Sequence, residues 1–297
     1  MNLHRFLLVG AAVAAVAGCS NDSTSPTLVT PPPSALLHII NAVPDTGAMD
    51  FRFVDVVNGV PNVEFTNLAF RGGTTIGYQP VSIGSHHLRV FMSSATSNFD
   101  PAYVSQIMAD TTFTFAEGVH YTFVFYGNTR PVPPATRGTQ KFLVLTDNFT
   151  VPTTWSVRAV NFNTAAADFY IQTVANTSSP VAVSTPSTTV TGTPTFAAVA
   201  PLTASAYTSI ALASSTQGHT VTATPAGATT PVWSAGFFPG IAAVAEVAGV
   251  SGALAALPGT RIAGSIFTGI LFPASVAGSK APSFTTPGVV VMADRFF

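Results

Sequence analysis

The chain has 297 residues, of which 47% are hydrophobic and only 8% are charged, and its formal net charge is -1. Ordinary soluble domains carry about 25% charged residues, so this composition excludes a disordered chain that is kept in solution by its charges. It also argues against nucleic-acid binding, because the few Lys and Arg residues are scattered and form no basic cluster.

The first 18 residues have the three parts of an export signal. A short polar stretch that ends at Arg5 precedes the apolar run Phe6–Ala17, and small residues follow. As a helix this run would be about 18 Å long, which is short of the roughly 30 Å hydrocarbon core of a bilayer. Residues 1–18 are therefore predicted to be a cleaved signal peptide.

The junction Val16-Ala17-Gly18-Cys19 resembles the lipobox of bacterial lipoproteins. The resemblance implies cleavage before Cys19, lipid on its sulfur, and a membrane as the first partner of the protein. The alternative is a buried cysteine behind an ordinary signal; Cys19 is the only cysteine, so it has no disulfide partner within the chain. Ser20 stands where an aspartate would indicate the inner membrane, so we expect the outer membrane, with the protein facing the periplasm or the cell surface.

Residues 19–34 are polar and end in Pro31-Pro32-Pro33, which predicts a tether that is semi-rigid at the prolines. Fifteen extended residues would reach roughly 50 Å from the membrane. The remainder is rich in Thr, Ser and Val and has 23 each of Gly, Pro and Phe, with short apolar runs between turn residues. This pattern predicts an all-β protein.

One pattern of motifs occurs twice after the tether, which predicts a duplicated domain. In each copy a strand that contains Asn is followed by a strand that begins Asp-Phe, at Asp50 and at Asp168. We therefore expect two tandem immunoglobulin-like antiparallel β-sandwich domains, at 35–150 and 151–297. The matched segments are 36–42 with 155–161, 84–90 with 218–222, 117–123 with 258–264, and 144–149 with 291–296.

The first copy also resembles a known family. Its segment Asn41-Ala-Val-Pro-Asp-Thr-Gly-Ala-Met-Asp-Phe51 is similar to the opening of the domain of unknown function 4397, His-Ala-Ser-Pro-Asp-Ala-Pro-x-Val-Asp-Val, with Asn41 in place of the histidine. Gly118-x-x-Tyr121-Thr122 is similar to the Gly-x-x-Tyr-Thr of that family. The resemblance implies an exported β-sandwich domain, often in tandem, and it implies no activity.

Four aspartates recur between the copies, Asp50 with Asp168 and Asp147 with Asp294. Paired carboxylates can perform acid–base or glycosidase chemistry, but aspartates beside strand ends more often accept backbone N–H bonds at turns. We favour the structural role. Because the sequence also has no Gly-x-Ser-x-Gly motif, no catalytic residue is predicted.

No metal or cofactor site is predicted either. His86 and His87 are adjacent, so in a strand their side chains point to opposite faces. Three further histidines have no second metal ligand at a suitable spacing. Asn41, Asp45 and Asp50 could offer oxygen ligands to calcium, but their spacing fits no calcium loop. The histidines without a partner are His38, His120 and His219.

The segment Ile241–Leu257 is apolar and rich in small residues. Membrane insertion is one interpretation, but the run is short for a span and Glu246 interrupts it. We expect a buried strand pair or an inserted helix instead. Most of the phenylalanines are predicted to fill cores, because sugar-binding platforms usually use Trp and Tyr.

Together these features predict a lipid-anchored, non-enzymatic envelope protein that binds an envelope protein or polysaccharide. Two alternatives stay open at this point. One is a surface hydrolase that uses loop carboxylates, and the other is an accessory subunit of an outer-membrane assembly.

Overall fold

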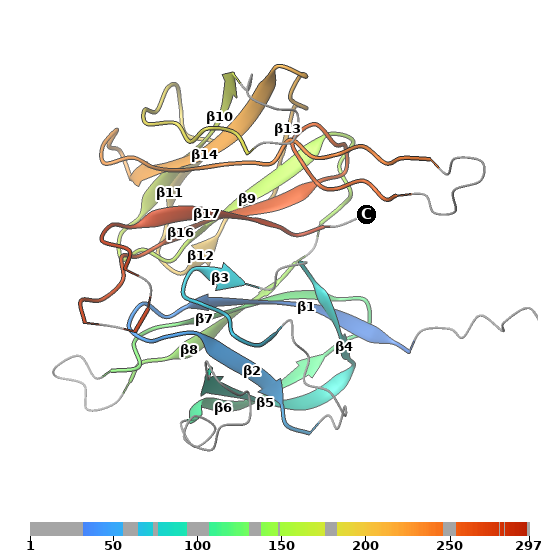
Figure 1. The fold of residues 1–297 in the computed structure, drawn as a ribbon, viewed down its shortest axis with the longest axis vertical. Helices are drawn as coiled ribbons and strands as arrows, with labels where there is room; N and C mark the ends of the chain where they lie inside the picture. The colour runs from blue at the N-terminus through green and yellow to red at the C-terminus, as the bar shows by residue number, and fades with distance from the viewer. Residues whose placement is uncertain are drawn as a thin grey trace, which may run out of the picture. The chain divides into compact units, whose positions relative to one another are not determined.

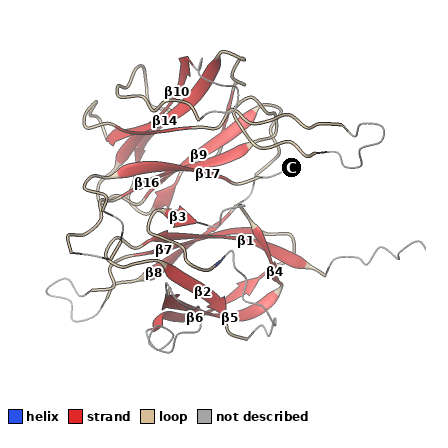
Figure 2. Ribbon diagram, in the orientation of Figure 1, coloured by secondary structure: helices blue, strands red, loops and turns tan. Residues whose placement is uncertain are grey.

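A computed structural model shows an all-β protein, as the composition predicts (Figure 2). Among the described residues there is no helix long and apolar enough to cross a membrane. Cys19, the export signal and nearly all of the tether lie outside the described residues. The structure describes residues 32–55, 65–73, 77–93, 107–130, 138–147, 149–175, 183–245, 254–278, 280–281 and 283–295.

The first eight strands form two sheets (Figure 1). Sheet A has the order β3-β1-β7-β8, with β4 also paired to β1, and sheet B has the order β2-β5-β6. The strands are β1 Ser34–Ala42, β2 Met49–Phe53, β3 Gly72–Gly73, β4 Gln79–Ser82, β5 Gly84–Met92, β6 Ile107–Phe115, β7 His120–Tyr126 and β8 Lys141–Thr146.

The next nine strands form two more sheets, and the predicted seam at residue 150 lies between β8 and β9. Sheet C has the order β12-β9-β16-β17, with β13 also paired to β9, and sheet D has the order β11-β10-β14-β15. The strands are β9 Trp155–Asn161, β10 Ala167–Ala175, β11 Phe196–Val199, β12 Thr203–Ala204, β13 Thr208–Ile210, β14 Gln217–Pro225, β15 Trp233–Gly236, β16 Ile266–Phe272 and β17 Gly288–Ala293.

Three hydrophobic clusters hold the four sheets together. The first fills the space between sheets A and B and includes Phe51 and Phe123, and the second fills the space between sheets C and D around Trp155. The third joins sheet A to sheet C, where Val124 of β7 packs with Ile270 of β16. Phenylalanines are therefore mainly core residues, as the composition indicates.

Strand pairing repeats between the two halves. Most neighbouring strands are antiparallel, but each half also has one parallel pair, β1 with β7 and β9 with β16. Asn41 and Asn161 occupy the same position: each side-chain amide donates to a carbonyl, of Leu68 and of Val199, at 2.8 Å. The segments 36–42 and 155–161 therefore lie on equivalent strands, but the residue-by-residue match is shifted by one position, so that His38 corresponds to Arg158.

One predicted match between the copies is wrong. Gly118 corresponds to Gly264 rather than to Gly259. The N–H of Gly118 donates to the carbonyl of Ser34, the first residue of β1. The N–H of Gly264 donates to the carbonyl of Thr154, which immediately precedes the equivalent strand β9. Both glycines have positive φ, 70° and 82°, a conformation that glycine adopts without steric cost. In this alignment the Gly-x-x-Tyr-Thr of the first copy becomes Gly264-x-x-Phe-Thr in the second.

The described ends of the segment Ile241–Leu257 form a strand pair that is exposed rather than buried, which corrects our expectation. Ile241 bridges Leu257 and Val244 bridges Leu254, so the described ends of the segment form a two-stranded arm that runs away from the sheets (Figure 1). All four side chains are exposed. Apolar side chains are usually buried in a core, but no second layer of the described chain covers these four residues.

Candidate functional site

Asp50 and Asp168 have the structural role that the sequence predicts. Asp50 accepts the N–H of Asn67 at 2.8 Å, and Asp168 accepts the N–H of Ala198 at 2.6 Å. Asn67 and Ala198 have φ values of 55° and 48°. The two carboxylates therefore stabilise equivalent left-handed turns, a conformation that costs energy for residues other than glycine.

Asp147 and Asp294 do not cap turns through their carboxylates, which corrects the predicted role. Each follows the last strand of its half, is buried, and accepts hydroxyl groups. Thr122 and Tyr78 donate to Asp147, whereas Thr268 and Tyr207 donate to Asp294 at 2.6 and 3.0 Å. We call these six residues and Arg158 the carboxylate cluster.

Arg158 links the two halves of the carboxylate cluster. Its guanidinium donates to Asp147 and to the hydroxyl of Thr268, the latter at 2.8 Å, and it lies over the ring of Tyr207 at 4.8 Å. One cation thus faces two carboxylates. Burial raises the pKa of Asp294 to about 6, although Arg158, Thr268 and Tyr207 act in the opposite direction. Oδ1 of Asp294 has no hydrogen-bond partner among the described residues.

The oxygens considered for calcium already accept protein donors. Asp45 accepts the N–H groups of Thr129 and Arg130 at 2.9 and 2.8 Å, and Oδ1 of Asn41 accepts the N–H of Val43 at 3.0 Å. In the part of the chain that the structure describes, no three His, Cys, Asp or Glu side chains are grouped as metal ligands.

His86 and His87 point to different surroundings, as adjacent strand residues should. His86 contacts Asp55 at 3.2 Å and packs against Phe53, whereas His87 contacts Asp110. These pairs lie on the surface and converge on no common point, so they indicate no shared site.

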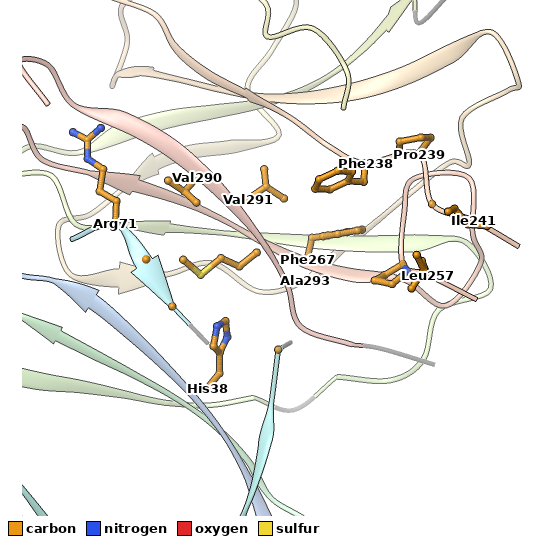
Figure 3. A pocket seen from close by; sticks show the side chains of 16 residues that line it. His38, Arg71, Phe238, Pro239, Ile241, Leu257, Phe267, Val290, Val291 and Ala293 are labelled. Atoms are coloured by element: carbon orange, nitrogen blue, oxygen red, sulfur yellow. The ribbon is translucent and has the colours of Figure 1, made fainter. Parts of the chain in front are cut away.

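A mainly apolar pocket with a volume of about 530 Å³ lies beside β17 (Figure 3). Ligand pockets usually measure roughly 300–1,000 Å³. We call it the β17 pocket. Its described lining is mainly apolar and includes no carboxylate, hydroxyl or thiol side chain. It consists of His38, Arg71, Gly72, Gly73, Gly77, Phe238, Pro239, Gly240, Ile241, Leu257, Pro258, Phe267, Val290, Val291, Met292 and Ala293.

His38 is the buried polar residue of the β17 pocket. Its side chain comes from β1 and its ring packs edge-on against Tyr78, with ring centroids 5.7 Å apart. Burial lowers its pKa to about 4, so the ring is neutral at physiological pH. Neither ring nitrogen has a hydrogen-bond partner among the described residues.

Arg71 is the only charged residue in the described lining, and its guanidinium joins the two halves of the chain. Its guanidinium donates to the carbonyls of Pro273 and Thr286 at 2.6 Å and lies 4.2 Å from the ring centroid of Phe284. Partial burial lowers its pKa to about 10, which leaves it cationic at neutral pH.

A second pocket of about 600 Å³ occupies the equivalent place beside β8. There Arg158 takes the position of His38, and Asp147 and Tyr207 also line the space. The second pocket is therefore polar, and its buried cation is fully engaged. The equivalent pockets of the two copies therefore differ in chemistry, one mainly apolar and the other polar.

Sequence reasoning did not find the β17 pocket. It considered His38 only as a metal ligand, and it gave no role to Tyr78 or Tyr207. Tyr78 and Tyr207 immediately precede β4 and β13, which pair with the first strand of each half, so the two tyrosines are structurally equivalent. They lie 37 and 46 residues after Asn41 and Asn161, so no fixed spacing in the sequence marks them. The lining of the β17 pocket comes from segments that are far apart in the chain, and no local motif marks it.

Comparison with known families agrees with the resemblance seen in the first copy. Residues 35–172 match the family model described as Domain of unknown function (DUF4397). The match covers a little under half of the chain and continues past β8 into β9 and β10. A comparison with curated proteins finds no significant match.

Proposed function

We propose that this chain is a non-enzymatic binding protein of the bacterial envelope, attached to a membrane through lipid on Cys19, that holds an apolar ligand in the β17 pocket. The observation that carries the proposal is the pocket itself: about 530 Å³ of mainly apolar space beside two neighbouring sheets. Apolar pockets with few polar groups are typical of ligand-binding sites.

The chemistry of the lining favours binding over catalysis. The described lining has no hydroxyl, thiol, amine or carboxylate side chain, and its one histidine, His38, has no hydrogen-bond partner among the described residues that could activate it for nucleophilic or acid–base work. Asp50 and Asp147, the carboxylates that a hydrolase would use, are buried and are held by Asn67, Arg52, Thr122, Tyr78 and Arg158.

The lipid anchor is tested by replacing Cys19 with serine. We expect the wild-type protein in the membrane fraction and the variant in the soluble fraction, because the serine hydroxyl does not replace the lipidated thiol. Fractionation followed by immunoblotting measures the distribution, and mass spectrometry of the amino terminus detects the lipid. Ser20→Ala is the matched control and should stay in the membrane. Retention of Cys19→Ser in the membrane would refute lipid anchoring.

The β17 pocket is tested with the soluble Cys19→Ser protein and the fluorescent apolar dye N-phenyl-1-naphthylamine. We expect saturable binding of one dye per chain. Leu257 lines the pocket and the residue is 52% exposed, so Leu257→Arg should place a charge at the mouth without disturbing a core. Loss of roughly half of the apolar contact of a leucine, about 1.4 kcal/mol, corresponds to tenfold weaker binding.

Leu254→Arg provides the matched control for this experiment. Leu254 belongs to the same arm and is 67% exposed, but it does not line the pocket. Its replacement should leave dye affinity unchanged. If the dye does not bind saturably, or if both variants weaken binding equally, the β17 pocket is not the binding site.

A further inference from the structure

We infer that the ligand of the β17 pocket is an aliphatic molecule with one uncharged hydroxyl group, which pairs with His38. This inference rests on the proposed function, because it names the class of ligand that the same pocket takes. Its first support is that His38 is 1% exposed and lines the pocket, yet neither ring nitrogen has a described hydrogen-bond partner. Buried polar side chains in native proteins are nearly always paired.

The equivalent position of the second copy shows that the fold can satisfy a polar side chain there. Arg158 donates to Asp147, Thr268 and Thr122. His38 lies in the same place on the parallel strand pair β1–β7 but has no such partners. Its unpaired nitrogens are therefore a property of the β17 pocket and not of this strand position.

The direction of the His38 ring places its nitrogens where a ligand can reach them. In Figure 3 the ring points from β1 toward the strands that carry Phe267, Val290 and Val291. Gly73 leaves room beside it, since a Cβ on Gly73 would lie 3.1 Å from Nε2 of His38. The ring thus lies at the wall of a pocket whose described lining is otherwise apolar except for Arg71.

The charge state of His38 selects the polar group of the ligand. A neutral imidazole has one N–H donor and one nitrogen acceptor, and a hydroxyl group is likewise both donor and acceptor. A carboxylate would bring an unpaired charge into a mainly apolar space, which is unfavourable. Arg71 does not neutralise this charge. Its guanidinium already donates to the carbonyls of Pro273 and Thr286 and lies over the ring of Phe284, and it points away from His38 (Figure 3).

The remaining lining defines the rest of the ligand. Val290 and Met292 come from β17 at the edge of sheet C, and Phe267 comes from the neighbouring β16. Phe238 and Leu257 come from the base of the arm. These side chains offer dispersion contacts and no further side-chain hydrogen bond. An unbranched or ring-bearing hydrocarbon with a single hydroxyl satisfies both parts of the site.

The test is competition against the bound dye by octan-1-ol, octane and octanoate. With the Cys19→Ser protein we expect octan-1-ol to compete at least tenfold more strongly than octane, and octanoate to compete less strongly than octan-1-ol. In His38→Phe, which keeps a ring of similar size, the advantage of octan-1-ol over octane should disappear while the dye still binds. His219→Phe replaces a buried histidine outside the pocket and should keep the advantage.

The outcomes separate the inference from the proposed function. If the dye binds but octane competes as well as octan-1-ol, or octanoate competes best, the inference is wrong and the apolar pocket stands. If the dye does not bind, the proposed function itself fails. Should His38→Phe not fold, nitrogen NMR of histidine-labelled protein decides: octan-1-ol must shift the ring resonances of His38, and octane must not.

Discussion

Replacing Arg158 with methionine is expected to lower the free energy of unfolding by roughly 3–5 kcal/mol, because it leaves the buried carboxylate of Asp147 without its cation. The side chains of Arg158 and Asp147 are 4% and 0% exposed, so water screens this pair little. The loss should appear as a lower midpoint of urea unfolding, monitored by circular dichroism, with an unchanged slope.

The matched control is Arg261→Met. Among the described residues, the guanidinium of Arg261 donates only to the carbonyl of Gln217, in an exposed position. Its removal should therefore change the free energy of unfolding by no more than about 0.5 kcal/mol. The double variant Asp147→Asn/Arg158→Met removes both charges and should regain part of the loss. If Arg158→Met were as stable as Arg261→Met, the ion pair would not hold the two halves together.

The all-β architecture and the layout of the repeat could be predicted from the sequence, because both depend on short local patterns. Strand alternation, turn residues and the recurring Asn and Asp-Phe positions survive in both copies. Asp50 and Asp168 could be assigned to turns for the same reason, since their acceptor roles depend on the residues around one strand end.

The sites between sheets could not be predicted in this way. Asp147 also lies at a strand end, but its partners come from β7, β9 and the segment before β4, which meet only when sheets A and C pack together. The exposure of Ile241 and Leu257 has the same origin: their apolar character indicates burial, but it does not indicate whether another layer covers them.

His38 shows why the β17 pocket could not be predicted from the sequence. A histidine within an apolar strand is read either as a metal ligand or as a satisfied core residue. Only its surroundings show that it is buried, neutral and without a described hydrogen-bond partner. Comparison with Arg158 adds what a single copy cannot provide, namely a version of the same position in which the polar group is paired.

Replacing Asp294 with asparagine is expected to stabilise the protein at neutral pH and not at acidic pH. The pKa of Asp294 is raised from 3.8 to about 6 in the folded chain. Between these values the unfolded chain loses the proton while the folded chain keeps it, so stability falls as the pH rises through this window. A shift of about two units amounts to roughly 3 kcal/mol, all of which is lost above pH 6.

The asparagine side chain has nearly the shape of the protonated aspartate and can still accept the hydrogen bonds from Thr268 and Tyr207. The two proteins should therefore be about equally stable near pH 4, and the variant should be more stable by roughly 3 kcal/mol near pH 7.5. Urea unfolding at a series of pH values measures this difference. Asp110→Asn is the contrast, because its contact with His87 lowers the pKa of that exposed carboxyl, so its replacement should bring no gain as the pH rises.

Comparing the variant with the wild type at each pH separates the contribution of Asp294 to the free energy of unfolding from the contributions of the histidines. Burial lowers the pKa of His38 and of His219 to about 4, so each makes the folded protein more stable as the pH rises from about 4 to 6.5, the opposite direction to Asp294. The whole protein can therefore show a nearly flat pH profile although its buried groups titrate. Both histidines remain in Asp294→Asn, so their contributions cancel in the difference in free energy of unfolding between variant and wild type. If this difference stayed constant from pH 4 to 7.5, Asp294 would be ionised throughout and Arg158 would compensate both carboxylates.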